Sequence, residues 1–285
     1  SPPTCSTVGM PGSPSGAPCR VCSTSSSGPS SRAVASCSSC RARTRSPTRG
    51  CSSRSVSSAE GGRGSEDDKV VAAWALFHAG EFQKAYDAGL KAGGAGIALA
   101  NKAQSIYANY LEKSEKARLA MFQEVVARAE AQAAAEPKNP NAHYWMAYAL
   151  GRYSQGISVA KALAQGLGAK VKTALETTIA LAPKHADAHI ALGAFHAEVI
   201  DKVGSLLGKT QGASKATGLA LYQQALKLTP ASAIAMVEYA NGLVMLEGER
   251  RMADAEKLYA DAAACIPADA MERLDVEMAK AELED

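Results

Sequence analysis

The sequence predicts an all-α protein, an α-solenoid of stacked helical hairpins preceded by a disordered N-terminal tail. From residue 67 onward the chain is rich in Ala, Leu, Lys, Glu and Gln, which are good helix formers. Apolar residues recur there at three- and four-residue steps, and no run alternates as a strand would. Prolines at 137, 183, 230 and 267 each follow an Ala- or Leu-rich run, at spacings of 46, 47 and 37 residues that indicate a repeat.

The tail differs from the rest of the chain in composition. Residues 1–59 contain no Leu, Ile, Phe, Tyr, Trp, Lys, Asp or Glu, while 19 are Ser and 7 are Arg. Such a segment cannot bury enough apolar surface to offset the entropy of ordering it. We therefore expect residues 1–65 to be disordered and residues 66–285 to form the helical repeat domain.

Net charge gives no indication of a nucleic-acid partner. All 28 acidic residues lie from Glu60 onward, against 31 − 7 = 24 basic ones, so this part of the chain carries 24 − 28 = −4. The overall charge of +3 is a property of the tail. We expect no nucleic acid among the partners.

Two cysteine pairs in the tail have a spacing that can surround zinc. Cys19 and Cys22 form one pair, and Cys37 and Cys40 form the other. A zinc ribbon also needs strand-forming residues to carry the two turns, and the tail has almost none. We expect no metal site there.

Three origins of the tail stay open. It is a genuine disordered segment, an organelle transit segment rich in Ser and Arg, or the product of translation out of frame. The last interpretation rests on an abrupt change in usage, from 7 Arg without Lys in residues 1–59 to 17 Lys and 6 Arg from residue 66 onward. The compartment follows from this choice: cytoplasmic by default, organellar with a transit peptide, periplasmic if a true export signal is missing. No run approaches the roughly 18 apolar residues of a membrane helix, so we expect no transmembrane segment.

Helix boundaries are marked by local signals. Gly80 is placed for a tight turn between the first two helices, and Asn139-Pro140 supplies an N-cap followed by proline in the first helical turn. The closing helix carries acidic residues that suit the polar end of a solenoid. We expect five hairpins followed by that helix, at residues 66–97, 98–138, 139–184, 185–231, 232–267 and 268–285.

Alignment on the first three prolines exposes the repeat itself. The residue ten positions after each proline is always small, and a larger residue stands at offsets of six and thirteen. This large–small–large order is typical of the first helix of a tetratricopeptide repeat, where the small residue lets the second helix approach closely. The three sets are His143, Ala147 and Leu150; His189, Gly193 and His196; and Met236, Ala240 and Leu243.

The chain resembles the regulator of microtubule dynamics family over about residues 120–285. The resemblance rests on Asn-Ala-His-Tyr-Trp-Met-Ala-Tyr-Ala-Leu-Gly at 141–151, Thr-Ile-Ala-Leu-Ala-Pro at 178–183 and Ala-His-Ile-Ala-Leu-Gly at 188–193. The third and fourth units exceed the 34-residue repeat by 12 and 13 residues, at 151–170 and 198–216. The resemblance implies a helical repeat fold and a binding role, and it leaves microtubule association open. A more distant likeness is to the tetratricopeptide-type accessory subunit of bacterial tripartite solute transporters.

No constellation of residues indicates catalysis. His185 and His189 share one helix face at a spacing that can bind zinc, but no Glu follows in the HExxH manner and no third ligand is near. His189 also occupies the repeat position of His143 and Met236, which assigns it to packing. We expect neither an enzyme nor a bound metal or cofactor.

The predicted binding site is the concave face of the solenoid. In this fold it is lined by the second, fifth, ninth and twelfth positions of the first helices, which carry no Lys or Arg here. The groove should be nearly neutral and partly apolar, with tyrosines as anchors. The residues predicted to contact a partner are Asn141, Tyr144, Tyr148, Asp187, Ile190, Asn241 and Val244.

Two functions compete at this stage. The first is a non-catalytic scaffold that binds a peptide or protein in the groove. The second is a solute-binding accessory protein in which the insertions close the groove into a pocket for a small apolar ligand. A third possibility is that the side chains predicted to line the groove pack against the insertions and bind no partner. The oligomeric state stays open.

Deletion of residues 1–65 is expected to leave helix content and melting temperature nearly unchanged, because this stretch contributes no apolar core. Circular dichroism with thermal unfolding of both chains checks this, and a large loss of either quantity would contradict it.

Overall fold

The computed structural model describes residues 60–284. All regular elements in this range are helices. The predicted tail with its two cysteine pairs lies outside the described residues, except that residues 60–65 form the start of the first helix. The elements are α1 Glu60–His78, α2 Phe82–Ala92, α3 Gly96–Ile106, the π-helical turn η1 Tyr107–Leu111, α4 Glu115–Ala135, α5 Pro140–Gln155, α6 Val159–Ala164, α7 Leu167–Leu181, α8 Ala186–Thr210, α9 Lys215–Leu228, α10 Ala233–Glu247, the 3-10 turn η2 Gly248–Arg251, α11 Met252–Ala263 and α12 Ala270–Glu284.

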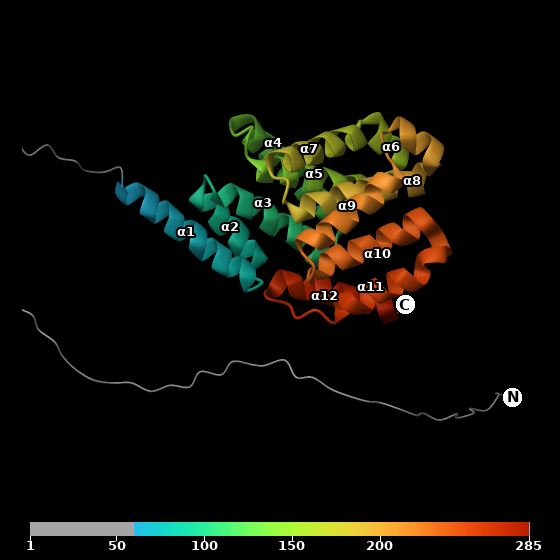
Figure 1. The fold of residues 1–285 in the computed structure, drawn as a ribbon. Coiled ribbons are helices and arrows are strands. Elements are labelled where there is room, and N and C mark those ends of the chain that lie inside the picture. The colour runs from blue at the N-terminus through green and yellow to red at the C-terminus, as the bar shows by residue number, and fades with distance from the viewer. Residues whose placement is uncertain (1–59, 285) are drawn as a thin grey trace, which may run out of the picture. The chain divides into compact units, whose positions relative to one another are not determined.

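The helices form an α-solenoid, as predicted. Neighbouring helices in the chain pack against each other, and α5, α8 and α10 each also contact a helix of the next or preceding hairpin (Figure 1). The five predicted hairpins correspond to α1–α2, α3–α4, α5–α7, α8–α9 and α10–α11. Gly80 has the positive φ of +86° that the predicted turn between α1 and α2 requires.

The prolines mark helix ends with a constant register. Pro137, Pro183 and Pro230 each lie two residues after the last helical residue, and the next helix begins three residues later. Short polar side chains then cap the new helix, as in Asn139, whose Oδ1 accepts a hydrogen bond from the Asn141 N–H at 3.0 Å.

The repeat histidines His143 and His189 contact the backbone at the proline junctions between helices. The Nε2 atoms of His143 and His189 lie 2.9 Å from the carbonyl oxygens of Pro137 and Pro183, six residues earlier in both repeats. His185 caps α8 through a hydrogen bond that its Nδ1 accepts from the Ala188 N–H. These contacts give both members of the His185/His189 pair a local structural role.

The small repeat residues face neighbouring helices. Ala147 and Ala240 are 1% and 0% exposed, and Gly193 is buried. The ring of Tyr222, itself 1% exposed, lies between Gly193 of α8 and Gly242 of α10. A Cβ atom at Gly193 would stand 3.1 Å from the ring, and one at Gly242 only 2.3 Å. Two successive repeats therefore approach each other through one aromatic ring between two glycines.

The insertions have two different structures. The first forms the short helix α6 and its flanking loops, whereas the second lengthens α8 by a segment that follows a break at Gly204. The closing helix α12 packs against α10 and α11, and it also reaches the first hairpin. Its residues Ala270, Met271 and Leu274 join the apolar cluster around Phe77 of α1. The closing helix, predicted to form the polar end of the solenoid, therefore also packs against the first hairpin.

Gly242→Ala is expected to lower the free energy of unfolding by about 1–3 kcal/mol, because the added methyl group overlaps the Tyr222 ring. Gly151→Ala is the matched control within α5. A Cβ there meets nothing within 4 Å, and loss of glycine flexibility should raise stability by about 0.5–1 kcal/mol. Urea unfolding of both variants checks this, and equal effects would show that the Tyr222 contact does not limit helix approach.

Candidate functional site: the concave groove

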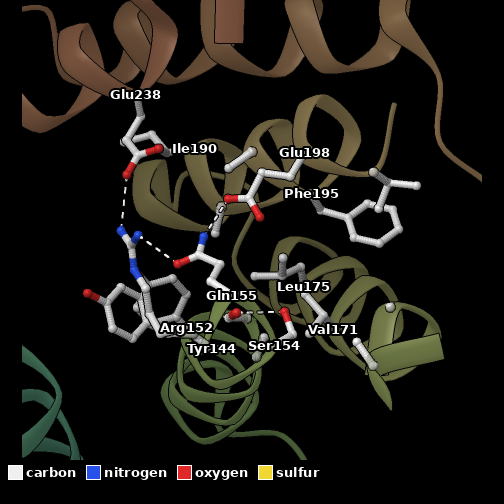
Figure 2. Close-up of a pocket in the computed structure, with 18 of the residues that line it drawn as sticks. Tyr144, Arg152, Ser154, Gln155, Val171, Leu175, Ile190, Phe195, Glu198 and Glu238 are labelled. Atoms are coloured by element: carbon white, nitrogen blue, oxygen red, sulfur yellow. Dashed lines mark hydrogen bonds and ion pairs between the residues drawn. The ribbon is translucent and has the colours of Figure 1, made fainter. Parts of the chain in front are cut away.

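A groove of about 200 Å³ lies among the helices, and Figure 2 shows side chains that line it. The first helices of the second, third and fourth hairpins line it, together with α10, α6, α7 and one residue of α12. Its apolar side chains include aromatic rings and branched aliphatic residues from α5, α7 and α8: Tyr144, Trp145, Val171, Leu175, Ile190 and Phe195.

The aromatic residues of α5 form one packed group in this groove. The rings of Tyr144 and Trp145 lie 4.8 Å apart between centroids, and Tyr148 lies 5.4 Å from Trp145. Burial raises the pKa of Tyr144 and of Tyr148 above the ordinary value, so both hydroxyls remain protonated at neutral pH. They can therefore donate hydrogen bonds to a bound molecule.

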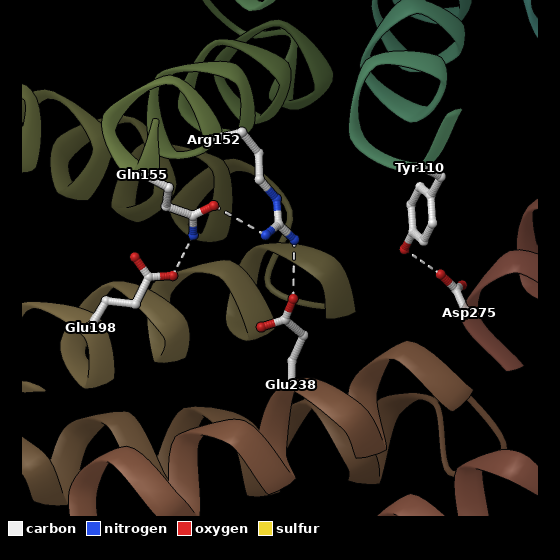
Figure 3. Close-up of polar contacts among 6 residues, drawn as sticks. All are labelled: Tyr110, Arg152, Gln155, Glu198, Glu238 and Asp275. Carbon is white, nitrogen blue, oxygen red and sulfur yellow. Dashed lines mark hydrogen bonds and ion pairs between the residues drawn. The ribbon is translucent and has the colours of Figure 1, made fainter. Parts of the chain in front are cut away.

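A polar belt lies in the groove, formed by Arg152, Gln155, Glu198 and Glu238 (Figures 2 and 3). The guanidinium of Arg152 donates to Glu238 Oε1 at 3.1 Å and to Gln155 Oε1 at 3.2 Å. The Gln155 side-chain amide in turn donates to Glu198. Burial raises the pKa of Glu198 above the ordinary value of a glutamate. The belt links α5, α8 and α10, which come from three successive hairpins.

The charges that line the groove balance. Lys102, Arg152 and Lys202 provide three positive charges, and Asp187, Glu198 and Glu238 provide three negative ones. The Arg152–Glu238 and Lys202–Glu198 pairs neutralise four of them locally, at 3.1 and 3.6 Å.

A second polar contact joins a residue that lines the groove to the closing helix. The hydroxyl of Tyr110, in the π-helical turn η1, donates to Asp275 Oδ1 of α12 at 2.5 Å (Figure 3). Burial, together with the nearby carboxylates of Asp187, Glu272 and Asp269, raises the pKa of Asp275 to about 7, although the Tyr110 hydrogen bond opposes this shift. Nearby, His78 Nδ1 of α1 lies 2.7 Å from Asp269 Oδ2. These two contacts hold α12 against the beginning of the solenoid.

The seven predicted partner-binding residues lie in different places. Tyr144, Tyr148, Asp187 and Ile190 line the groove together. Asn241 lies in an adjoining cavity of about 320 Å³, where its Oδ1 accepts a hydrogen bond from the Tyr259 hydroxyl.

The other two predicted residues line neither cavity: Asn141 is exposed at the start of α5, and Val244 is half-buried on α10. On α10, α12 covers part of the helix, because Val237 packs in one apolar cluster with Val276 of α12.

The charged residues of the belt are absent from the predicted set. Arg152, Glu198 and Glu238 each come directly after a position that the repeat pattern assigns to the groove, namely 151, 197 and 237. Those positions hold Gly, Ala and Val, which are short, so the longer side chain next to them reaches the cavity instead. The repeat positions themselves carry no Lys or Arg, but Lys102, Arg152 and Lys202 outside these positions line the groove.

Within the part of the chain that the structure describes, no group of three or more His, Cys, Asp and Glu residues is arranged to hold a metal ion. None of the helices in residues 60–284 combines the length and apolarity that crossing a bilayer requires.

The stability advantage of the Asp275→Asn variant over wild type is expected to grow as the pH rises from about 4 to about 7. Folded Asp275 keeps its proton over this interval while the unfolded carboxyl loses it, so wild-type stability falls. A shift from 3.8 to about 7 corresponds to about 4 kcal/mol at most. Asparagine retains an oxygen that accepts from Tyr110. Urea unfolding of both proteins at about pH 4 and about pH 8 checks this.

Asp269→Asn is the control of opposite sign. Burial raises the pKa of Asp269, but hydrogen bonds from the Glu272 N–H and from His78 outweigh it and hold the pKa below the ordinary value. Its contribution to stability is present at neutral pH and is lost in acid, so this variant should be destabilised at neutral pH. The same pH dependence in both variants would contradict the assignment of Asp275.

The comparisons with known proteins agree with this architecture. A crystal structure of a thermophilic tetratricopeptide (TPR) protein from Thermus thermophilus superposes with a TM-score of 0.55 and 15% sequence identity, covering 76% of this chain and 99% of the other. At this identity the likeness establishes the fold alone. Comparison with curated protein sequences found no match. The model of the family described as Regulator of microtubule dynamics protein 1-3 matches residues 82–282, and the chain therefore belongs to this family.

Proposed function

We propose that this protein is a non-catalytic scaffold that binds a segment of a protein partner along the concave groove. The observation that supports this most directly is the combination of apolar and aromatic side chains with a polar belt in one groove. A protein segment that binds in a groove uses both kinds of contact. Apolar contacts supply affinity, and hydrogen-bonding groups fix the register and direction of the segment.

The apolar and aromatic side chains supply the anchoring surface. Tyrosine and tryptophan are frequent among residues that dominate binding energy, because each offers a large rigid apolar face together with one polar atom. Tyr148 is the half-buried member of the α5 group and therefore presents part of its ring to the groove. The Arg152 guanidinium lies 5.4 Å from the centre of this ring, which holds the ring in place.

The polar belt supplies the hydrogen-bonding groups. Gln155 and Glu198 keep acceptor capacity beyond their mutual contact, and Arg152 has five N–H donors, of which two are used within the belt. A partner's main chain that crosses the belt can exchange hydrogen bonds with these groups. The balanced charge of the groove favours a segment with little net charge.

The competing function, a pocket for a small apolar solute, has less support. The groove of about 200 Å³ and the adjoining cavity of about 320 Å³ share the polar residues Arg152, Glu198 and Glu238, whereas small-molecule sites are lined predominantly by apolar side chains. The belt of paired charges also divides the apolar surface, which suits a chain that crosses it better than an apolar solute.

Tyr148→Ala is expected to reduce capture of the groove partner by roughly thirtyfold, the effect of losing about 2 kcal/mol at an anchoring residue. The full chain is immobilised, and partners from an extract of the source organism are quantified by mass spectrometry. Purified microtubules form a separate arm, because the family is named for microtubule dynamics.

Tyr86→Ala is the matched control for this experiment. Tyr86 on α2 is also half-buried under an arginine, with the Arg128 guanidinium 5.2 Å from the ring centre, but it does not line the groove. Partners that are lost equally from both variants depend on general stability. If no partner is lost selectively from Tyr148→Ala, the groove is not the binding surface.

A further inference from the structure

Charge is unevenly distributed along the helical part of the chain. Residues 137–175 and 202–237 contain five and four basic residues, and neither stretch contains an Asp or Glu. From residue 60 onward the remaining residues therefore carry 24 − 9 = 15 basic and 28 acidic residues, or 15 − 28 = −13. The first insertion, residues 151–170, lies within the first stretch. The second insertion, residues 198–216, overlaps the second stretch from residue 202 onward.

The insertions also expose large apolar side chains. Leu206 is 85% exposed and Leu207 47% exposed, both on the segment of α8 that follows the break at Gly204. Val159 and Leu163 of α6 are 40% and 44% exposed. Exposure of four aliphatic side chains on two short segments is costly in water and calls for a surface that covers them.

The two segments lie at the same groove. Val159 and Leu163 line it together with Val203 and Gln211, which flank the α8 segment on either side in sequence. We call the six residues Val159, Lys161, Leu163, Leu206, Leu207 and Lys209 the insertion tip.

The lysines of the insertion tip are available for an external anion. Lys161 and Lys209 are exposed, and among the described residues neither has a carboxylate oxygen within 4.0 Å. By contrast, Lys172, Lys202 and Lys215 pair with Glu176, Glu198 and Glu247. The tip thus combines exposed aliphatic side chains with positive charge that no described carboxylate neutralises at close range.

We propose that the insertion tip docks on an anionic lipid surface. Leucines enter the boundary between headgroups and acyl chains, while lysines contact lipid phosphates, each contributing about 1 kcal/mol near the surface. The residues at the centre of protein–protein interfaces are enriched in aromatics, Met and Arg, and the tip has none of these. Two leucines and two lysines give weak, reversible docking. This surface is separate from the polar belt and does not depend on the function proposed for the groove.

Leu206→Trp in the full chain reports insertion at this one position. Vesicles are made of equal parts phosphatidylserine and phosphatidylcholine, with bromine on the phosphatidylcholine acyl chains to quench nearby tryptophan. We expect quenching that is strong with these vesicles, weak with phosphatidylcholine alone and reduced by added salt. Adding Lys209→Gln should shift the lipid titration about fivefold to higher concentration, the effect of losing about 1 kcal/mol.

Ile266→Trp is the matched control. Ile266 is 93% exposed, but it lies in the loop before α12, between Asp261 and Asp269 in sequence. It should show no more quenching than the wild-type chain, whose Trp74 and Trp145 provide the background. The site-specific signal also separates docking of the tip from any binding by the Arg-bearing residues 1–59.

Three results would overturn the proposal. They are equal quenching in Leu206→Trp and Ile266→Trp, equal quenching with neutral and anionic vesicles, and cosedimentation of the protein with vesicles without quenching of Leu206→Trp. A spectral shift of Leu206→Trp with polyglutamate but not with vesicles would also overturn it, because this would assign the tip to an acidic protein.

Discussion

The architecture depends on how closely helices of successive hairpins can approach. Ala147, Gly193 and Ala240 are buried where helices meet, and the Tyr222 ring occupies the space that glycines leave between α8 and α10. A side chain at either glycine would push these helices apart. The distance between α5, α8 and α10 sets the width of the groove, so the same small residues that stabilise the solenoid also bring Arg152 within reach of Glu238.

Contacts between the two ends of the solenoid give the groove its boundary. The closing helix α12 joins the apolar cluster of α1 and bonds Tyr110 through a buried carboxyl. A tetratricopeptide array is commonly open, since each repeat contacts only its neighbours. Here the contact of α12 with α1 links elements almost 200 residues apart, with His78 and Asp269 separated by 191 positions. The π-helical turn η1 presents Tyr110 to this junction, in keeping with the frequent use of such turns at functional positions.

The molecule separates two kinds of surface. The groove is lined by equal numbers of positive and negative side chains, most of them paired. The insertion tip carries exposed lysines and leucines, and it lies in stretches without acidic residues. Paired charges inside a groove favour contacts whose strength depends little on salt, whereas exposed lysines act through a field that salt screens. The partner proposed for the groove and the lipid surface proposed for the tip should therefore differ in the salt dependence of their binding.

The sequence by itself determined the helical class, the helix ends at the repeat prolines and the positions of close helix contact. These depend on local chemistry: helix propensity, proline's missing N–H, capping side chains and the three- to four-residue spacing of one helix face. The same spacing predicted that Tyr144, Tyr148, Asp187 and Ile190 lie near one another, and all four line the groove. Only the tertiary structure decided that Arg152, Glu198 and Glu238 form its belt and that α12 covers part of α10. Both depend on side-chain reach between helices distant in sequence, which no local period encodes.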